Sequence, residues 1–194
     1  MGEPNRLLAA AAEIQAFCTG ADWKFCFIGG IAVQHWGEAR LTRDADLTVF
    51  TGVGDEARYV DALLACFAAR IDGMRAFALR HRVVLLRASN GIALDVSLGA
   101  LDFENAAVEQ SALVEIADGV RLTLCSASAL TVFKVFAGRP QDWLDVEGIV
   151  AKSGRQIDWH GVRAELRTLL ELKEDIESLP RLEMILARRG IGAG

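Results

Sequence analysis

The sequence lacks the features by which several classes of protein are recognised. Its four cysteines are scattered singly among apolar residues, with no C-x-x-C pair, at Cys18, Cys26, Cys66 and Cys125. Paired cysteines at short spacing are typical of metal sites and redox centres, and disulfides are typical of oxidising compartments. We therefore predict buried free thiols in a reducing compartment.

Histidine is scarce, and long apolar runs are missing. His35, His81 and His160 have no mutual spacing that indicates a zinc site or a catalytic triad, so we interpret them as bystanders. No apolar stretch reaches the roughly 18 residues that a membrane span needs. The first residues contain Glu3 and Glu13 and lack the charged start and apolar core of a signal peptide. We expect a soluble cytoplasmic protein without a membrane partner.

Positive charge is also in the minority, because the formal net charge is −5 at pH 7. This balance argues against a general nucleic-acid coat protein, although it leaves room for a nucleic-acid substrate held by a local basic patch. One basic group is formed by Arg75, Arg80, Arg82 and Arg87. Such a group is usually a solvated face, and the alternative is that it guides a polyanionic acceptor.

The chain has the composition and the patterning of a globular protein of one domain or two small ones. It has 194 residues, of which 52% are hydrophobic and 24% charged. Hydrophobic periodicity predicts an α/β first part, with helices over 5–18, 31–36 and 56–70, strands over 23–28, 45–50 and 120–124, and a hairpin of 83–87 with 92–97. An all-helical second part follows, with helices over 126–136, 141–151, 160–170, 173–179 and 180–189.

The segment FIGGIAVQHWGEARLTRDADLTVF, residues 27–50, carries the strongest chemical signal. Asp44 and Asp46 stand at i and i+2 of a predicted strand, so both carboxylates point to one face. Two like charges side by side are costly unless a positive charge lies between them. They could be surface carboxylates at a strand edge, but this strand leads into a core. The pair therefore favours a divalent metal, and Mg²⁺ prefers carboxylates together with substrate phosphates.

A third carboxylate, Asp95, lies inside the apolar run Ile92-Ala93-Leu94-Asp95-Val96. A charge in such a run is rarely unpaired. One interpretation is a structural ion pair with Arg82 or Arg87. The other is a third metal ligand, which would also be a candidate general base toward an attacking hydroxyl, in a two-metal site for displacement at phosphorus.

Other positions have both a structural and a phosphate-binding interpretation. Gly29-Gly30 forms a turn between an apolar strand and a short helix, where backbone N–H groups could face a triphosphate. Lys134 lies in a strongly apolar helix and either extends to solvent or is held toward phosphates. Asp142 falls in the first turn of a helix, which it could stabilise by charge alone, and Asp145 lies one turn later on the same face.

These residues together resemble a known superfamily. Gly29-Gly30, followed by Arg40-x-Thr42-x-Asp44-x-Asp46 and a later strand carboxylate, is similar to the polymerase-β-type nucleotidyltransferases. The segments GGIAVQHWG and RLTRDADL are most similar to the AbiEii-like group, which includes toxins of type IV toxin–antitoxin pairs. ALTVFKVFAGRPQDWLDVEGI resembles the helical Lys…Arg-x-x-Asp-x-x-Asp signature of those proteins. Many superfamily members have Gly-Ser where this chain has Gly29-Gly30.

The resemblance implies an α+β fold and a Mg²⁺-dependent enzyme. The expected architecture is a small mixed β-sheet nucleotidyltransferase core flanked by helices over residues 1–122, followed by a C-terminal helical bundle over residues 123–194. The implied reaction moves a nucleoside monophosphate from an NTP to a hydroxyl and releases pyrophosphate. The acceptor would be RNA such as tRNA, with an antitoxin as a possible partner. A small molecule such as an aminoglycoside, or a catalytically silent nucleotide-binding module, is the alternative.

The resemblance also implies roles for individual residues. Asp44, Asp46 and Asp95 would be the catalytic carboxylates and would hold Mg²⁺. Gly29, Gly30 and Thr42 would contact the triphosphate. Lys134 and Asp142 would lie at the cleft between the two halves and take part in binding the nucleotide.

Overall fold

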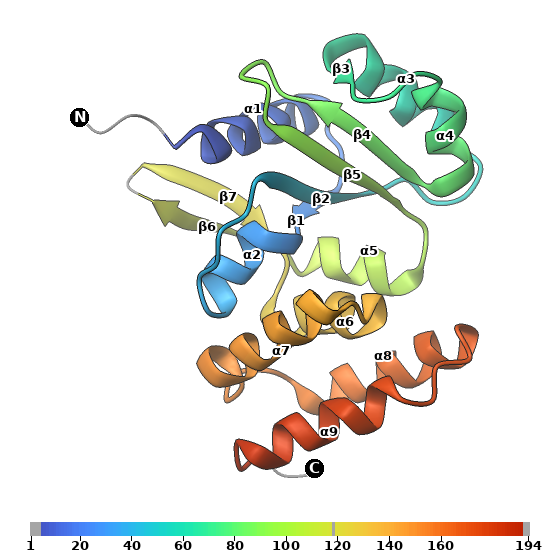
Figure 1. Ribbon diagram of the computed structural model, residues 1–194. Helices are drawn as coiled ribbons and strands as arrows, with labels where there is room; N and C mark the ends of the chain where they lie inside the picture. Colours follow the sequence, from blue (N-terminus) through green and yellow to red (C-terminus); the bar gives the residue numbers. More distant parts are fainter. Residues whose placement is uncertain (1–4, 118, 192–194) are drawn as a thin grey trace. The chain divides into compact units, whose positions relative to one another are not determined.

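The described chain divides into two structural units. The computed structural model describes residues 5–117 and 119–191 (Figure 1). The sheet unit consists of Met1–Ile31 and Leu41–Cys125, and the helical unit of Ala32–Arg40 and Ser126–Gly194. The helix α2 (Gly29–Trp36) begins in the sheet unit and ends in the helical unit.

The sheet unit is built on one mixed sheet in the order β3-β4-β5-β2-β1-β7-β6. Its strands are β1 (Phe25–Phe27), β2 (Asp44–Phe50), β3 (Ala68–Ala69), β4 (Val83–Arg87), β5 (Ala93–Gly99), β6 (Ala112–Ala117) and β7 (Val120–Leu124). The strands β2 and β5 are parallel neighbours at the centre, and β1 is antiparallel to β2 on the other side. The helices of this unit are α1 (Arg6–Gly20), α3 (Glu56–Cys66), α4 (Met74–His81) and α5 (Asp102–Glu109).

The two faces of this sheet differ in character. On one face Leu47 of β2 and Val96 of β5 join a core that includes Ile14 of α1 and Leu63 of α3, all four side chains being buried. The helix α5 contacts β1 and β2 but contributes nothing to that core, so it lies on the opposite face (Figure 1). Because side chains alternate along a strand, that opposite face receives Asp44 and Asp46 of β2 and Asp95 of β5.

The helical unit packs four helices around α6. They are α6 (Ala127–Ala137), α7 (Pro140–Ser153), α8 (Trp159–Leu172) and α9 (Ser178–Arg188), and α6 contacts the other three. Fully buried side chains such as Leu130, Ile149 and Leu166 form their shared core. Ser126 accepts the backbone N–H of Ala129 at 3.1 Å and caps α6, the helix that is predicted over 126–136. Among the helices that the structure describes, none combines the length and apolar character of a membrane span.

The predicted fold class is confirmed, as are the central strands and most of the helices. The hairpin is confirmed too, because β4 and β5 are antiparallel and Gly91 has φ of +84° in the turn between them. Four short elements of the described chain were not predicted: α4, α5 and the edge strands β3 and β6. The strands β3 and β6 have no buried residue, and α4 and α5 bury only two and three residues, so none of them has a clear hydrophobic period.

Two predicted helices are wrong in part or whole. The helix predicted over 56–70 ends at Cys66, and Ala68–Ala69 pairs with β4 as β3. No helix covers 173–177, and α9 begins at Ser178, inside the predicted range. Glu174 there has φ of +56°, and Asp175 accepts the backbone N–H groups of Glu177 and Ser178 just before α9 begins. A side chain that binds these free N–H groups favours a turn and a new helix start over a continuing helix.

The prediction of free thiols is confirmed at all four cysteines, and the prediction that they are buried is wrong for one of them. All four thiols are free, and Cys18, Cys26 and Cys125 are buried. Cys66, however, is exposed, because it is the last residue of α3 and faces away from the core. Burial also raises the pKa of the Cys18 thiol to about 12, which makes that side chain unreactive at neutral pH.

Candidate metal and nucleotide site

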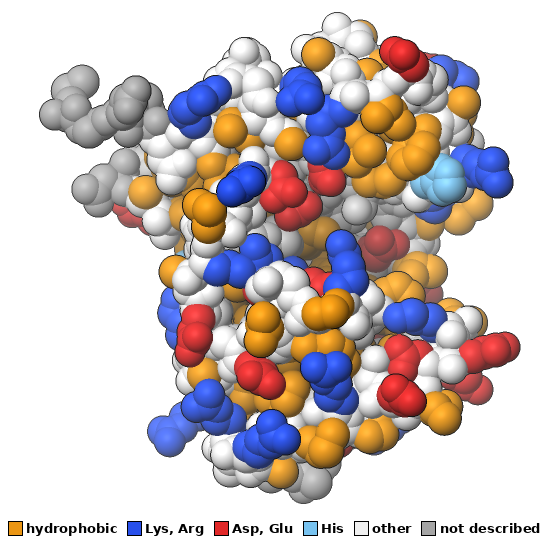
Figure 2. All heavy atoms as spheres, in the orientation of Figure 1, with side chains coloured by type: hydrophobic (Ala, Val, Ile, Leu, Met, Phe, Trp, Pro, Cys, Tyr) orange, Lys and Arg blue, Asp and Glu red, His pale blue; other side chains and the backbone are white. Residues whose placement is uncertain are grey.

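Sheet register brings the three predicted carboxylates together. Asp46 of β2 pairs directly with Asp95 of the parallel strand β5, and Asp44 lies two residues earlier on the same face. One carboxylate oxygen from each residue lies within 4.8 Å of the others, and all three residues are half-buried. We call Asp44, Asp46 and Asp95 the carboxylate trio. In Figure 2, acidic side chains gather over this part of the sheet unit, with basic side chains beside them.

The double glycine is explained by contact with the strand that follows it. Gly29 has φ of +61°, and a Cβ there would lie 2.0 Å from Oδ2 of Asp46. A Cβ on Gly30 would lie 2.3 Å from Oγ1 of Thr42. Each glycine therefore admits one side chain of the Thr-x-Asp-x-Asp segment against its backbone. These glycines are also the first two residues of α2, so that the helix starts two residues earlier than predicted.

Thr42 supports the trio from the loop before β2. Its hydroxyl donates a hydrogen bond to Oδ1 of Asp44 at 3.0 Å. This bond orients the first carboxylate, while the Gly29 backbone limits the space open to Asp46. The geometry therefore gives Thr42 a contact with a carboxylate, and its predicted contact with the triphosphate remains a prediction.

A residue that sequence reasoning missed, Arg70, forms an ion pair with Asp95. The sequence predicts Arg82 or Arg87 as the partner of Asp95 in a structural ion pair. That prediction is wrong, because the partner is Arg70. Arg82 instead pairs with Glu56 and donates to backbone oxygens of Gly52 and Leu98. No spacing in the sequence indicates Arg70, because its position depends on how β3 pairs with β4.

The pKa of Asp95 is raised by this environment. Burial of the carboxyl has the largest effect, the nearby Asp44 charge acts in the same direction, and the Arg70 guanidinium opposes both. A divalent cation would act in the same sense as Arg70 and favour the ionised form. Three half-buried carboxylates supply the hard oxygen ligands that Mg²⁺ prefers, so the residues present fit such an ion.

Lys134 and Asp142 lie in the helical unit and are bound to each other. The ammonium of Lys134 contacts Asp142 at 2.9 Å and Asp145 at 2.8 Å, and the residue is only 8% exposed. Lys134 therefore does not extend to solvent. Asp142 also accepts the backbone N–H of Arg139 at 3.2 Å, as expected for a carboxylate at a helix start.

Asp145 completes this network through Arg40. The guanidinium of Arg40 donates two hydrogen bonds to the two oxygens of Asp145, at 2.6 and 2.9 Å. Burial would raise the pKa of Asp145, but the hydrogen bonds from Arg40 and Lys134 outweigh it and lower the pKa below 3.8. Arg40, Lys134, Asp142 and Asp145 thus form one ion network in which the two carboxylates and the lysine are buried. The predicted nucleotide contact of Lys134 and Asp142 remains a prediction.

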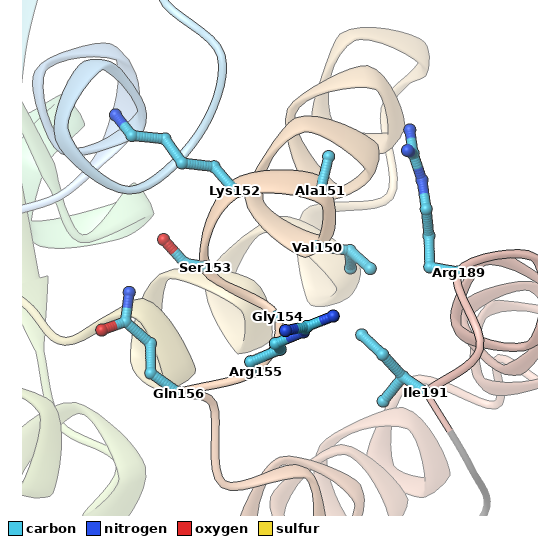
Figure 3. A pocket seen from close by; sticks show the side chains of 9 residues that line it. All are labelled: Val150, Ala151, Lys152, Ser153, Gly154, Arg155, Gln156, Arg189 and Ile191. Atoms are coloured by element: carbon cyan, nitrogen blue, oxygen red, sulfur yellow. The ribbon is translucent and has the colours of Figure 1, made fainter.

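The histidines do not join a metal-binding group among the described residues. His35 packs edge-on against Trp36, and His81 packs against Phe77. The carboxylate trio is the group of candidate ligands found in the described part of the chain. A cavity of about 580 Å³ in the helical unit, between the end of α7 and Ile191, includes none of the predicted site residues (Figure 3).

This sheet and its helices form a fold that is shared with solved structures of a nucleotidyltransferase-like protein and of an antibiotic-resistance factor. No protein-family model matches the sequence, and no curated protein sequence matches it. An antigenic nucleotidyltransferase-like protein from Paracoccidioides brasiliensis shares the fold, with a TM-score of 0.52 and 15% identity over 93% of each chain. The antibiotic-resistance factor ANT(2'')-Ia, solved in solution, has a TM-score of 0.56 and 14% identity over 89% of this chain and 97% of its own.

Proposed function

We propose that this chain is a Mg²⁺-dependent nucleotidyltransferase that moves a nucleoside monophosphate from an NTP to a hydroxyl acceptor. The observation that carries the proposal is the carboxylate trio on β2 and β5, positioned by Thr42 and by the close approach of Gly29. A group of three carboxylates beside a glycine turn provides oxygen ligands for a cation and a backbone that phosphates can approach, and both serve phosphoryl transfer.

Each residue of the site has a stated part in the reaction. Asp44 and Asp46 would hold Mg²⁺, which would neutralise phosphate charge when bound. Asp95 accepts the proton of the attacking hydroxyl, because one of its oxygens remains available when the other is bound to Arg70. The hydroxyl oxygen forms a bond to the α-phosphorus, the bond from that phosphorus to the β-phosphate oxygen breaks, and pyrophosphate leaves. The Gly29-Gly30 backbone lies where a phosphate chain can approach closely.

We further propose that the acceptor is RNA, and that the chain belongs to the AbiEii-like group. This proposal rests on the sequence resemblance of GGIAVQHWG, RLTRDADL and the helical signature around Lys134. An antitoxin protein would then be its partner. The second candidate is a small-molecule acceptor, which is favoured by the net charge of −5 and by the shared fold of the antibiotic-resistance factor ANT(2'')-Ia.

Transfer of label from NTPs tests the reaction. The purified chain is incubated with Mg²⁺ and each of the four α-labelled NTPs, once with total RNA and once with a panel of aminoglycosides. We expect labelled RNA, no transfer in the presence of EDTA, and a loss of more than about 100-fold in Asp44→Asn. Asp61→Asn is the matched control, because Asp61 is a carboxylate of the same unit that pairs with Arg75 outside the trio.

The outcomes separate the candidates. Label on an aminoglycoside alone would replace RNA by a small-molecule acceptor and leave the reaction class intact. Equal transfer by wild type and Asp44→Asn would contradict the catalytic assignment. An absence of both transfer and NTP binding would favour a catalytically silent module with this fold.

A further inference from the structure

Arg70 occupies a defined place in the row of residues that contains the carboxylate trio. Its backbone N–H donates to the carbonyl of Leu85 at 2.9 Å, which continues the β3–β4 ladder by one residue. Leu85 pairs with Asp95 across β4 and β5, and Asp95 pairs with Asp46 across β5 and β2. The sheet register itself therefore places Arg70 in the same row as two of the three carboxylates.

The side chain of Arg70 is bound at one end and unsatisfied at the other. Its Nη2 donates to Oδ1 of Asp95, and the two side chains are 22% and 30% exposed. Its Nε is buried and has no hydrogen-bond partner among the described residues. An ordinary structural arginine would satisfy such a buried donor, because leaving it unpaired costs about 1–3 kcal/mol. A half-buried, incompletely satisfied cation beside candidate metal ligands is more typical of a functional site.

We propose that Arg70 is a positioning residue that holds Asp95 by one oxygen and limits the affinity of the trio for its metal. This inference rests on the proposed function of the trio. The three carboxylates carry a formal charge of −3, and Arg70 adds a fixed charge of +1 next to one of them. Its planar group fixes the direction of the Asp95 carboxylate, which a flexible lysine would do less well.

The two parts of the proposal predict opposite effects of removing the arginine. Loss of the positive charge strengthens metal binding, because a unit charge a few ångströms from a divalent ion changes its affinity by about tenfold even with water-like screening. Loss of the hydrogen bond frees Asp95 to rotate and slows transfer. A half-exposed structural ion pair would change neither quantity and would affect stability only slightly.

The test measures metal binding directly as well as activity. Mn²⁺ binding to the full chain is followed by electron paramagnetic resonance at low salt, for wild type, Arg70→Met and Arg70→Lys, with thermal unfolding to verify that each variant folds. We expect Arg70→Met to bind Mn²⁺ about tenfold more tightly and to have a lower kcat at saturating metal. Arg70→Lys keeps the charge, so its Mn²⁺ affinity stays near that of wild type while its kcat falls.

The control for these experiments is an arginine of the same unit that lies away from the carboxylate trio. Arg58→Met removes an arginine that pairs with Asp55 on the outside of the same unit, and it should change neither metal affinity nor kcat. Unchanged or weaker Mn²⁺ binding in folded Arg70→Met overturns the proposal for Arg70. If Mn²⁺ binding responds as expected but no NTP is turned over, the proposed function and the positioning role of Arg70 fail, and its effect on metal affinity stands. Absence of Mn²⁺ binding to wild type overturns both.

Discussion

Replacing Gly29 by alanine should damage the site by a mechanism that the structure makes quantitative. A Cβ at this position would lie 2.0 Å from Oδ2 of Asp46, whereas ordinary contact begins at 3.4 Å, so the two groups must separate by about 1.4 Å. Displacements of this size at a reacting group cost about 100-fold in rate. The residue also has φ of +61°, which an alanine adopts at a cost of roughly 1–2 kcal/mol.

Gly52→Ala separates the two contributions. Gly52 has φ of +68°, but nothing lies within 4 Å of a Cβ built there. Gly52→Ala should therefore lower the free energy of unfolding only by the backbone cost of the positive φ, roughly 1–2 kcal/mol. Gly29→Ala should lower the free energy of unfolding by roughly 1–3 kcal/mol more, because an added methyl group in a packed site forces its neighbours to shift.

The assay pairs urea unfolding with two measurements on the site. Mn²⁺ affinity and the rate of label transfer should both fall in Gly29→Ala and stay at the wild-type level in Gly52→Ala. If the two variants lose equal stability and keep equal metal affinity, the contact between Gly29 and Asp46 does not shape the site, and this reasoning is refuted.

Three further predictions concern the rest of the chain. Lys134→Met leaves the buried carboxylates of Asp142 and Asp145 without their shared cation and should cost about 3–5 kcal/mol in urea unfolding; a loss under about 1 kcal/mol would contradict the network. The lowered pKa of Asp145 contributes stability above about pH 4 that is lost as pH falls through that pKa, so Asp145→Asn should flatten the acid limb of a pH–stability curve. Cys66 alone should react with a thiol reagent in the native chain, and all four thiols should react in denaturant.

The local sequence pattern was sufficient to predict the helices and strands that have a regular hydrophobic period. The buried strand Asp44–Phe50, the hairpin around Gly91 and the capped helix after Ser126 were all predicted, because each has its own turn or cap chemistry. The short elements α4, α5, β3 and β6 were missed. The turn over 173–177 was misread as a helix, since its conformation depends on hydrogen bonds to Asp175.

The sequence by itself determined the membership of the carboxylate trio and the presence of the double glycine. Asp44, Asp46 and Asp95 are visible as charges in apolar strands, where an unpaired carboxylate would be too costly. Their proximity required the parallel pairing of β2 with β5, a contact between residues about fifty positions apart in the chain.

Tertiary structure alone decided what surrounds those carboxylates. Arg70 reaches Asp95 because β3 extends the sheet beside β4, and Gly29 meets Asp46 because β1 pairs with β2. Arg40 and Lys134 likewise meet at Asp145 only after the helices of their unit have packed. These are long-range contacts between single side chains, and no period or spacing in the sequence encodes them.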